Sequence, residues 1–350
     1  MRTIALACAA LMGLSGGAVA ADEATIAAAN KEGGLVIYSA TDYAQVQPMI
    51  EAFRAKYPNI KVDYNDLNTN IIYNRVISEA AANQVGGDVV WNSAMDLQMR
   101  LAKDGYLQSY ESSERANLPG WAVSDDHKLY AITVEPVGAI YNKLAVGAAD
   151  APNTRAKLIA LMSRPDAKGR IATFDPEKSG IAFLIQTNDA KETTTFKGLV
   201  AAFRAAGGKS YSSSGSMRET VASGENILAF NLIGSYAMEW AKDSQTIGVV
   251  FGEDYTPAFS RLAGILDKAP HPNAAKVFMD FALGQEGQAA LAGKGLPSVR
   301  NDVATGLNID TLNTRVGGNL KPIPVDAALL DYTNPMKRVQ FLRGWAAGKN

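Results

Sequence analysis

Short apolar runs alternate with helical repeats along the first third of the chain. Residues 35–38 follow two glycines and predict a buried strand, after which apolar residues recur at helical spacing from Val46 to Tyr57. Pro48 lacks an N–H group, so regular helix is expected from about Gln45, or else a kink at the proline. Between strand and helix lies a turn that carries hydroxyl groups, residues 39–42.

The same unit of strand, polar turn and helix recurs twice before residue 105. An alternating strand near residues 60–65 leads to a helix that Asn68 and Thr69 are expected to cap. An apolar strand at residues 89–91 leads to a helix that Asn92 and Ser93 are expected to cap. Strands that alternate with helices in this way predict a mostly parallel sheet covered by helices.

Longer extended runs replace this alternation around Glu135 and Pro136. Because proline cannot donate to a ladder, Pro136 is expected away from the centre of a sheet, in a strand that passes between two lobes. The alternation then resumes, and residues 259–266 are expected to be a strand that returns the chain to the first lobe. The tail from Asp302 is rich in turn residues and ends in a predicted helix at residues 336–345.

These elements predict an α/β protein of two lobes, each with a mostly parallel sheet flanked by helices, joined by crossing strands. A chain of 350 residues with 47% hydrophobic composition can bury two moderate cores. We expect lobe 1 to comprise residues 21–134 and about 259–302, and lobe 2 residues 135–258 and about 303–350. Hinge motion is expected around residues 134–137 and 259–262.

Residues 1–20 have the composition of a secretory signal peptide. Arg2 precedes a stretch of apolar and small residues, and residues 18–20 form an A-x-A cleavage site. An ordinary N-terminal helix is the alternative interpretation. Cleavage after Ala20 would also remove Cys8, the only cysteine, so the mature chain would contain no disulfide and no cysteine metal site. An exported protein of this kind is typical of the bacterial periplasm.

Charge and motifs exclude several classes of function. The formal net charge is -1, with basic and acidic residues interspersed, which argues against nucleic-acid binding. There is no G-x-S-x-G elbow after the predicted signal peptide, and His127 and His271 lie far apart without an H-E-x-x-H motif. Residues 208–210 resemble the end of a P-loop, but Phe203 stands at the first glycine position. We therefore expect a binding protein without catalysis, cofactor or bound metal.

Hydroxyl-bearing residues gather at strand-to-helix turns in both halves of the chain. A single Ser or Thr at such a turn is most often an N-cap that contributes about 1 kcal/mol to the helix. Five such turns together predict a cleft in which hydroxyls, backbone N–H groups and helix N-termini bind an anion. The candidate ligand-binding residues are Ser39, Thr41, Asn92, Ser93, Glu135, Asp175, Ser179, Ser214, Gly215, Ser216, Ser235 and Tyr236.

Three of these candidates have strong alternative roles. Glu135 lies at the predicted crossing, where it could contact the hydroxyls or an amine of a ligand. The alternative is a partly exposed charge on a strand. Asp175 precedes a proline and is equally suited to stabilising its own turn. Tyr236 lies four residues from Trp240, a spacing that fits a helix face in the core as well as a stacking surface.

Six segments together resemble the periplasmic substrate-binding proteins of ABC importers. The resemblance is to the subgroup named for ferric iron binding, which also contains sugar-phosphate and phosphonate binders. It implies a type II two-lobed fold, a periplasmic monomer, and delivery of a solute to an inner-membrane ABC permease. The segments are VIYSA at 36–40, AFRAKYP at 52–58, DVVW at 88–91, DP at 175–176, NLIGSY at 231–236 and HPNAA at 271–275.

The sequence departs from the iron carriers of that subgroup, which bind the metal with two adjacent tyrosines. The matching positions are Ser235 and Tyr236, and Ser93 replaces an expected acidic ligand. Hydroxyl groups in place of hard anionic ligands favour a phosphoryl group over Fe³⁺. We therefore expect capture of a small anionic, phosphorylated organic ligand. The alternatives are an Fe³⁺-binding protein of an iron importer, a periplasmic phosphate-ester hydrolase and a sensor partner of a histidine kinase.

Overall fold

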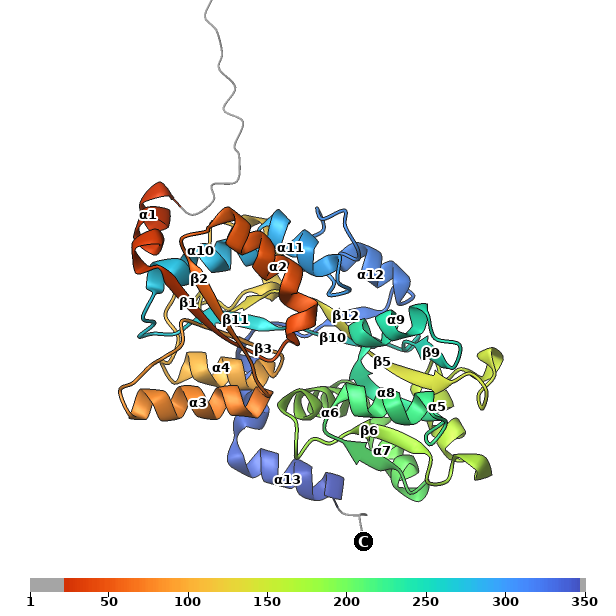
Figure 1. The fold of residues 1–350 in the computed structure, drawn as a ribbon. Coiled ribbons are helices and arrows are strands. Elements are labelled where there is room, and N and C mark those ends of the chain that lie inside the picture. The colour runs from red at the N-terminus through yellow and green to blue at the C-terminus, as the bar shows by residue number, and fades with distance from the viewer. Residues whose placement is uncertain (1–21, 347–350) are drawn as a thin grey trace, which may run out of the picture.

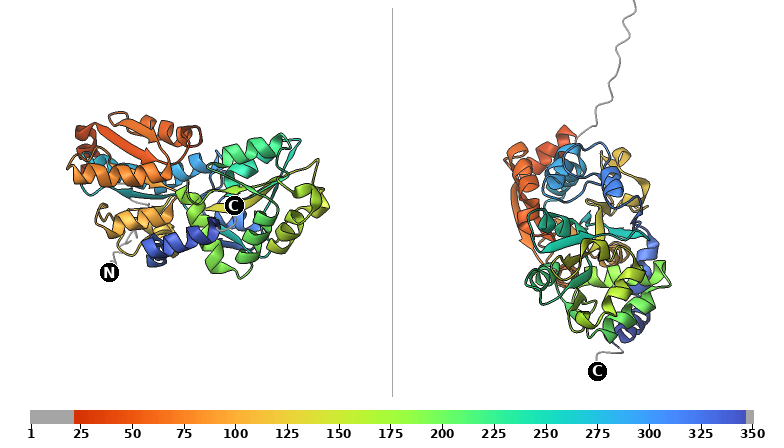
Figure 2. Two further views of the ribbon diagram at one scale, coloured as in Figure 1. Left: turned by 90° about the horizontal axis from the view of Figure 1, so that it is seen from below. Right: turned by 90° about the vertical axis from the view of Figure 1, so that its right-hand side faces the viewer.

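The computed structural model describes residues 22–346, which form two lobes around two separate β-sheets (Figure 1). The predicted signal peptide, residues 1–20, lies outside the described residues. Helices cover both sheets, and Figure 2 shows the two lobes from two further directions. Over residues 22–346, no helix combines the length and the apolar character that a membrane span requires.

Lobe 1 is defined by the five-stranded sheet with the order β2-β1-β3-β11-β4. The predicted strand–helix units supply β1, β2 and β3, which pair in parallel, whereas β11 pairs antiparallel with both β3 and β4. Its elements are α1 (Glu23–Glu32), β1 (Gly34–Ser39), α2 (Tyr43–Lys56), β2 (Lys61–Asp66), α3 (Thr69–Ala81), β3 (Val89–Asn92), α4 (Met95–Lys103), β4 (Tyr130–Ala131), β11 (Leu262–Ile265), α10 (Pro272–Leu283) and α11 (Gln285–Ala292).

Lobe 2 is defined by the seven-stranded sheet with the order β12-β10-β5-β8-β6-β7, in which β9 also pairs with β5. Parallel pairs join β8, β6 and β7, whereas β5 is antiparallel to β8, β9 and β10. Its elements are β5 (Glu135–Asn142), α5 (Arg155–Met162), β6 (Ile171–Phe174), α6 (Gly180–Glu192), α7 (Phe196–Ala205), β7 (Lys209–Tyr211), α8 (Ser214–Ala222), β8 (Leu228–Ile233), α9 (Gly234–Lys242), β9 (Ile247–Val250), β10 (Thr256–Phe259) and β12 (Leu320–Pro322).

Two neighbouring segments carry the chain between the sheets. The first leads from β4 to β5 and the second from β10 to β11, and Phe259 of β10 pairs with Glu135 of β5. The single strand expected at residues 259–266 is therefore wrong, because the chain changes sheets between Phe259 and Leu262. The expectation that Pro136 lies away from a sheet centre is also wrong, because Pro136 is part of β5, which has β10 on one side and β8 on the other. The pairing of β5 with β8 begins only at the next residue, Val137.

Two helices begin differently from the sequence prediction. Helix α2 begins at Tyr43, so Pro48 lies in its second turn and one backbone hydrogen bond of the helix is absent. Helix α4 has Ala94 at its N-cap, so neither Asn92 nor Ser93 caps it. The Asn92 side chain instead accepts the backbone N–H of Ala94 in a turn that ends β3.

The C-terminal segment contacts both lobes, although the sequence placed it in lobe 2. It contains α12 (Ile309–Arg315), β12, the 3₁₀ helix η5 (Ala327–Thr333) and α13 (Pro335–Ala346). Strand β12 joins the sheet of lobe 2 beside β10, and η5 packs against α4 of lobe 1. In Figure 1 its last helix, α13, is dark blue and lies below α4 and α6.

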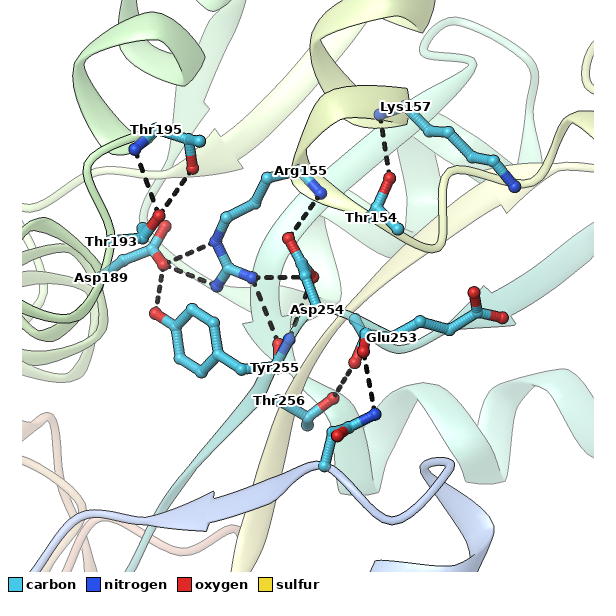
Figure 3. Close-up of polar contacts among 12 residues, drawn as sticks. Thr154, Arg155, Lys157, Asp189, Thr193, Thr195, Glu253, Asp254, Tyr255 and Thr256 are labelled. Carbon is cyan, nitrogen blue, oxygen red and sulfur yellow. Dashed lines mark hydrogen bonds and ion pairs between the residues drawn. The ribbon is translucent and has the colours of Figure 1, made fainter.

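A buried ion-pair network holds the elements of lobe 2 together (Figure 3). Arg155, at the start of α5, donates to Asp189 of α6 at 2.6 Å and to Asp254 at 3.1 Å. The hydroxyl of Tyr255 also donates to Asp189, and Arg155 lies 3.8 Å from the centre of the Tyr255 ring. Arg155 and Asp189 are almost fully buried, so this network fixes α5 and α6 against the segment that leads to β10.

Gly234, where β8 passes directly into α9, lies close to the strand that joins the lobes. A Cβ atom at this position would lie 2.4 Å from the carbonyl oxygen of Pro136. Backbone cannot move away as a flexible side chain does, so only glycine allows α9 to begin so close to β5.

We predict that Gly234→Ala lowers the free energy of unfolding by about 1–3 kcal/mol, as overpacking does. Gly198→Ala in α7 is the control, because its Cβ would lie 3.5 Å from Ile159 and alanine favours a helix interior by about 1 kcal/mol. Urea denaturation followed by circular dichroism compares the two variants. Equal stability of both variants would contradict the close approach at Gly234.

Candidate functional site

One buried ion pair joins the two segments that cross between the lobes. Arg261, between β10 and β11, donates from Nε to Oε1 of Glu135 at 2.6 Å and from Nη2 to Oε2 at 3.2 Å. The two side chains are 1% and 0% exposed. Burial alone would lower the pKa of Arg261, but the adjacent carboxylate of Glu135 outweighs it and the pKa is raised. The guanidinium is therefore charged, and the pair fixes the two crossings against each other.

The same pair connects the polar turns of both lobes. In lobe 1, Nη1 of Arg261 donates to the carbonyl of Ala40 at 3.0 Å and to Oγ1 of Thr41 at 3.1 Å. In lobe 2, the hydroxyl of Ser235 at the start of α9 donates to Glu135. The predicted residues Thr41, Glu135 and Ser235 thus lie together, with protein partners at both carboxylate oxygens of Glu135.

Two tyrosines flank this pair. The ring of Tyr236 lies 5.4 Å from the Arg261 guanidinium, and the hydroxyl of Tyr64 donates to the carbonyl of Thr41 at 2.5 Å. Burial raises the pKa of the Tyr236 hydroxyl; Arg261 opposes this effect, while Asp42 and Glu135 add to it. Burial likewise raises the pKa of Tyr64. Both phenols are therefore neutral hydrogen-bonding groups at neutral pH.

A second contact between the lobes lies where the N-terminal ends of three helices meet. The backbone N–H of Gly180, at the start of α6, donates to Oγ1 of Thr69 in α3 at 3.1 Å. Nδ2 of Asn92 donates to the carbonyl of Thr69 at 3.0 Å. A Cβ atom on Gly180 would lie 2.9 Å from the Cβ of Ala94. The lobes are thus closed on each other at this point, which we call the helix contact.

Two serines beside the helix contact have unused hydroxyl groups. Ser93 of lobe 1 and Ser179 of lobe 2 are 2% and 4% exposed, and neither side chain forms a hydrogen bond within residues 22–346. Helix α4 begins two residues after Ser93 and α6 directly after Ser179, and neither helix has an N-cap side-chain hydrogen bond, whereas Asn68 caps α3 and Ser213 caps α8. The N–H of Gly180 is bonded to Thr69 and the N–H of Met95 to the carbonyl of Ser93, so these helix N-termini offer an anion their partial positive charge and their remaining N–H groups.

The remaining candidates divide into two groups. Ser39 accepts the N–H of Thr41 at 3.1 Å, and Ser214 accepts the N–H of Ile233 at 3.3 Å, so both support the turns around the ion pair. Three others make contacts only within lobe 2. Asp175 accepts the N–H of Glu177 and the hydroxyl of Ser210, Ser216 bonds to the capping residue Ser213, and Gly215 is exposed in the first turn of α8.

The sequence reasoning missed Arg261 and Thr69. Arg261 is a single charged residue inside an apolar run at a lobe crossing, and that position was the available signal. Thr69 was considered only as a helix cap, whereas its side chain reaches the other lobe. Within residues 22–346, no group of three or more His, Cys, Asp or Glu side chains is placed to hold a metal ion.

Asp96 is a buried carboxylate in the first turn of α4. It is 3% exposed, and its Oδ1 atom has no hydrogen-bond partner. Burial raises its pKa to about 6, opposed by the backbone N–H of Leu97 and by the charge of Arg338 in α13. The carboxylate therefore takes up a proton more readily in the folded chain than in the unfolded chain.

The model of the family described as bacterial extracellular solute-binding protein matches residues 48–312. A search of the curated proteins found no match.

Solved structures of the same architecture are numerous. A substrate-binding protein of an ABC transporter from Agrobacterium tumefaciens is 34% identical, with a TM-score of 0.85 over 91% of this chain and 94% of that one. AfuA from Actinobacillus pleuropneumoniae, solved with exogenous fructose-6-phosphate, is 20% identical, with a TM-score of 0.73 over 90% and 98%. Iron-bound HitA from Pseudomonas aeruginosa is 20% identical, with a TM-score of 0.71 over 91% and 99%. These matches confirm the predicted two-lobed α/β fold.

We predict that Arg261→Met lowers the free energy of unfolding by about 3–5 kcal/mol, because it leaves the carboxylate of Glu135 buried without its charge partner. Lys56→Met is the matched control, since Lys56 and Glu286 form an ion pair with side chains 46% and 52% exposed, and should cost less than about 1 kcal/mol. The double variant Arg261→Met/Glu135→Met should recover part of the loss in urea denaturation. Similar losses for Arg261→Met and Lys56→Met would refute the role given to the buried pair.

We predict that Asp96 makes the protein less stable as pH rises from about 4 to 6. Because its pKa is raised in the folded state, the folded chain binds more protons in this window, and the free energy of unfolding falls by roughly 2–3 kcal/mol. Asp96→Asn should remove this pH dependence and raise the free energy of unfolding at pH 7. The control Asp63→Asn, on the exposed side of β2, should leave both the pH dependence and the stability at pH 7 unchanged. Parallel pH–stability curves for the parent and Asp96→Asn would contradict the assignment.

Proposed function

The chain belongs to the family of bacterial extracellular solute-binding proteins, and we propose that it captures an anionic, phosphorylated small organic molecule between its lobes. As a member of this family it is the periplasmic solute-binding component of an ABC transporter, and it is not an enzyme. The class of ligand is our inference from the site. The closed protein would carry this ligand to the transporter's permease in the inner membrane.

The helix contact is the observation that carries this proposal. The unused hydroxyls of Ser93 and Ser179 lie on opposite lobes, beside the uncapped N-termini of α4 and α6. A charge-assisted hydrogen bond contributes about 1.5–3 kcal/mol, and micromolar affinity requires only about 8 kcal/mol. Two hydroxyls and a few helix N–H groups therefore suffice for an anion, and a ligand held from both sides favours the closed lobes.

The charges around the ion pair favour an organic anion over a ferric ion. Glu135 is paired with Arg261 and Ser235, so its carboxylate has no oxygen left for a metal. The tyrosine hydroxyls and exposed Asp42 instead suit the polar, uncharged part of a ligand such as a sugar.

We predict that Ser93→Ala and Ser179→Ala each weaken binding of the preferred ligand by about 10- to 100-fold, the loss of one hydrogen bond to a charged group. Ser223→Ala, exposed at the end of α8, is the control and should leave the affinity unchanged. Isothermal titration calorimetry measures all three, and circular dichroism verifies that each variant is folded. Full affinity in both cleft variants would contradict the proposed anion site.

A ligand panel tests the class of ligand itself. Sugar phosphates, phosphonates, the matching unphosphorylated sugars and Fe³⁺ are added singly, and the melting temperature is recorded. The proposal expects stabilisation by at least one phosphoryl or phosphonyl compound and none by its unphosphorylated counterpart. Stabilisation by Fe³⁺ alone, with a visible charge-transfer band, would overturn the ligand class and leave the family membership intact.

A further inference from the structure

The C-terminal segment makes a path from lobe 2 to lobe 1 and back again. After β12 in the sheet of lobe 2, the N–H of Val325 donates to the carbonyl of Trp121, beside β4 in lobe 1, at 2.9 Å. The 3₁₀ helix η5 then packs against α4, with Leu329 buried in the main core. Helix α13 returns to α6 and α7 of lobe 2, below the helix contact in Figure 1.

Aromatic side chains attach α13 to lobe 2. The ring of Phe341 lies 5.5 Å from Phe183 of α6 and 6.0 Å from Phe196 of α7. Trp345 stacks on Phe203 of α7 at 5.9 Å, and Arg338 lies 4.0 Å from the centre of the Phe183 ring. These contacts tie α13 to the same helix, α6, whose first residues contact lobe 1.

The connection between the two attachment points is short and stiff. Helix η5 ends at Thr333 and α13 begins at Pro335, so only Asn334 separates them. Pro335 has a fixed φ angle and restricts Asn334 to extended conformations, and the Asn334 side chain accepts the N–H of Met336 at 2.9 Å. The segment therefore cannot lengthen when α4 and α6 move apart.

We propose that residues 325–346 form a latch that holds the lobes closed, and that the lobes separate only when α13 leaves α6 and α7. The latch joins α4 to α6, the two helices that Ala94 and Gly180 bring together at the helix contact. Opening the cleft there must break one of its two attachments. This proposal rests on the proposed function in one respect: the lobes are taken to open in order to exchange a ligand.

The attachment of α13 is the weaker of the two. Among the described residues of α13, only Trp345 is buried, and Met336 and Val339 are 81% and 46% exposed. A groove of about 910 Å³ runs beside Phe196, Phe341 and Trp345, so α13 covers this face of lobe 2 incompletely. Leu329 of η5 and Trp345 of α13 are both buried in cores, but the backbone of η5 packs closely against α4, whereas α13 reaches α6 and α7 through long aromatic side chains. Release from lobe 2 therefore costs less than release from lobe 1.

Distances between the lobes in the ligand-free protein test the latch. Spin labels are placed on Gln47→Cys in α2 and Glu219→Cys in α8, both exposed, in a chain whose only native cysteine is replaced by Cys8→Ser. Pulsed electron paramagnetic resonance then compares the parent with Phe341→Ala/Trp345→Ala. We expect the ratio of open to closed molecules to rise by about tenfold or more in the variant.

Control variants distinguish an effect on lobe opening from a general loss of stability. Phe281→Ala removes contacts with Phe53 and Tyr57 inside lobe 1, and should lower the melting temperature without changing the distances. If the double variant does not fold, Pro335→Gly/Arg338→Ala tests the same release with the buried aromatics retained. Unchanged distances in a folded latch variant, or open lobes in the parent, would overturn the proposal. No ligand is used, so an error in the proposed ligand class cannot produce either result.

Discussion

The bidentate ion pair between Arg261 and Glu135 is the constraint on which the rest of the molecule depends. It lies where the chain passes between the two sheets, and both partners are almost fully buried. A buried pair of this kind contributes little net stability, because desolvation opposes the attraction, but its geometry is specific. The pair also bonds to the turn after β1 in lobe 1 and to the start of α9 in lobe 2, and so fixes both beside the crossings.

The proposed binding site consists of polar groups that this arrangement leaves without hydrogen-bond partners among the described residues. The charges of Glu135 and Arg261 at the crossings are satisfied within the protein, whereas the helix contact retains unused hydroxyls on Ser93 and Ser179. The helices that follow these serines lack side-chain caps, although the chain caps neighbouring helices with Asn68 and Ser213. The described chain thus forgoes the modest stabilisation of an N-cap side chain at two helices on opposite lobes, and the N-termini of these helices lie where the lobes meet.

Local patterns predicted most of the fold, because strand and helix periodicity depends on near neighbours. The runs that became β1, β2 and β3 were found in this way, and so was the capping of α3 by Asn68. The failures concern long-range partners. Arg261 contacts a residue 126 positions away, and the N–H of Gly180 bonds to Thr69 across 111 positions. Asp175 bonds within lobe 2, to the N–H of Glu177 and the hydroxyl of Ser210, so its contact with a ligand stays a prediction.

The central claim is that an anion binds without a metal at the N-termini of α4 and α6, and a ligand-bound crystal structure tests it most directly. The protein would be crystallised with whichever compound native mass spectrometry finds bound after purification. The account predicts a phosphoryl or phosphonyl group within hydrogen-bonding distance of Ser93 and Ser179, with no metal between the lobes. A metal ion bound by Tyr64 or Tyr236, or an anionic group held away from both serines, would contradict it.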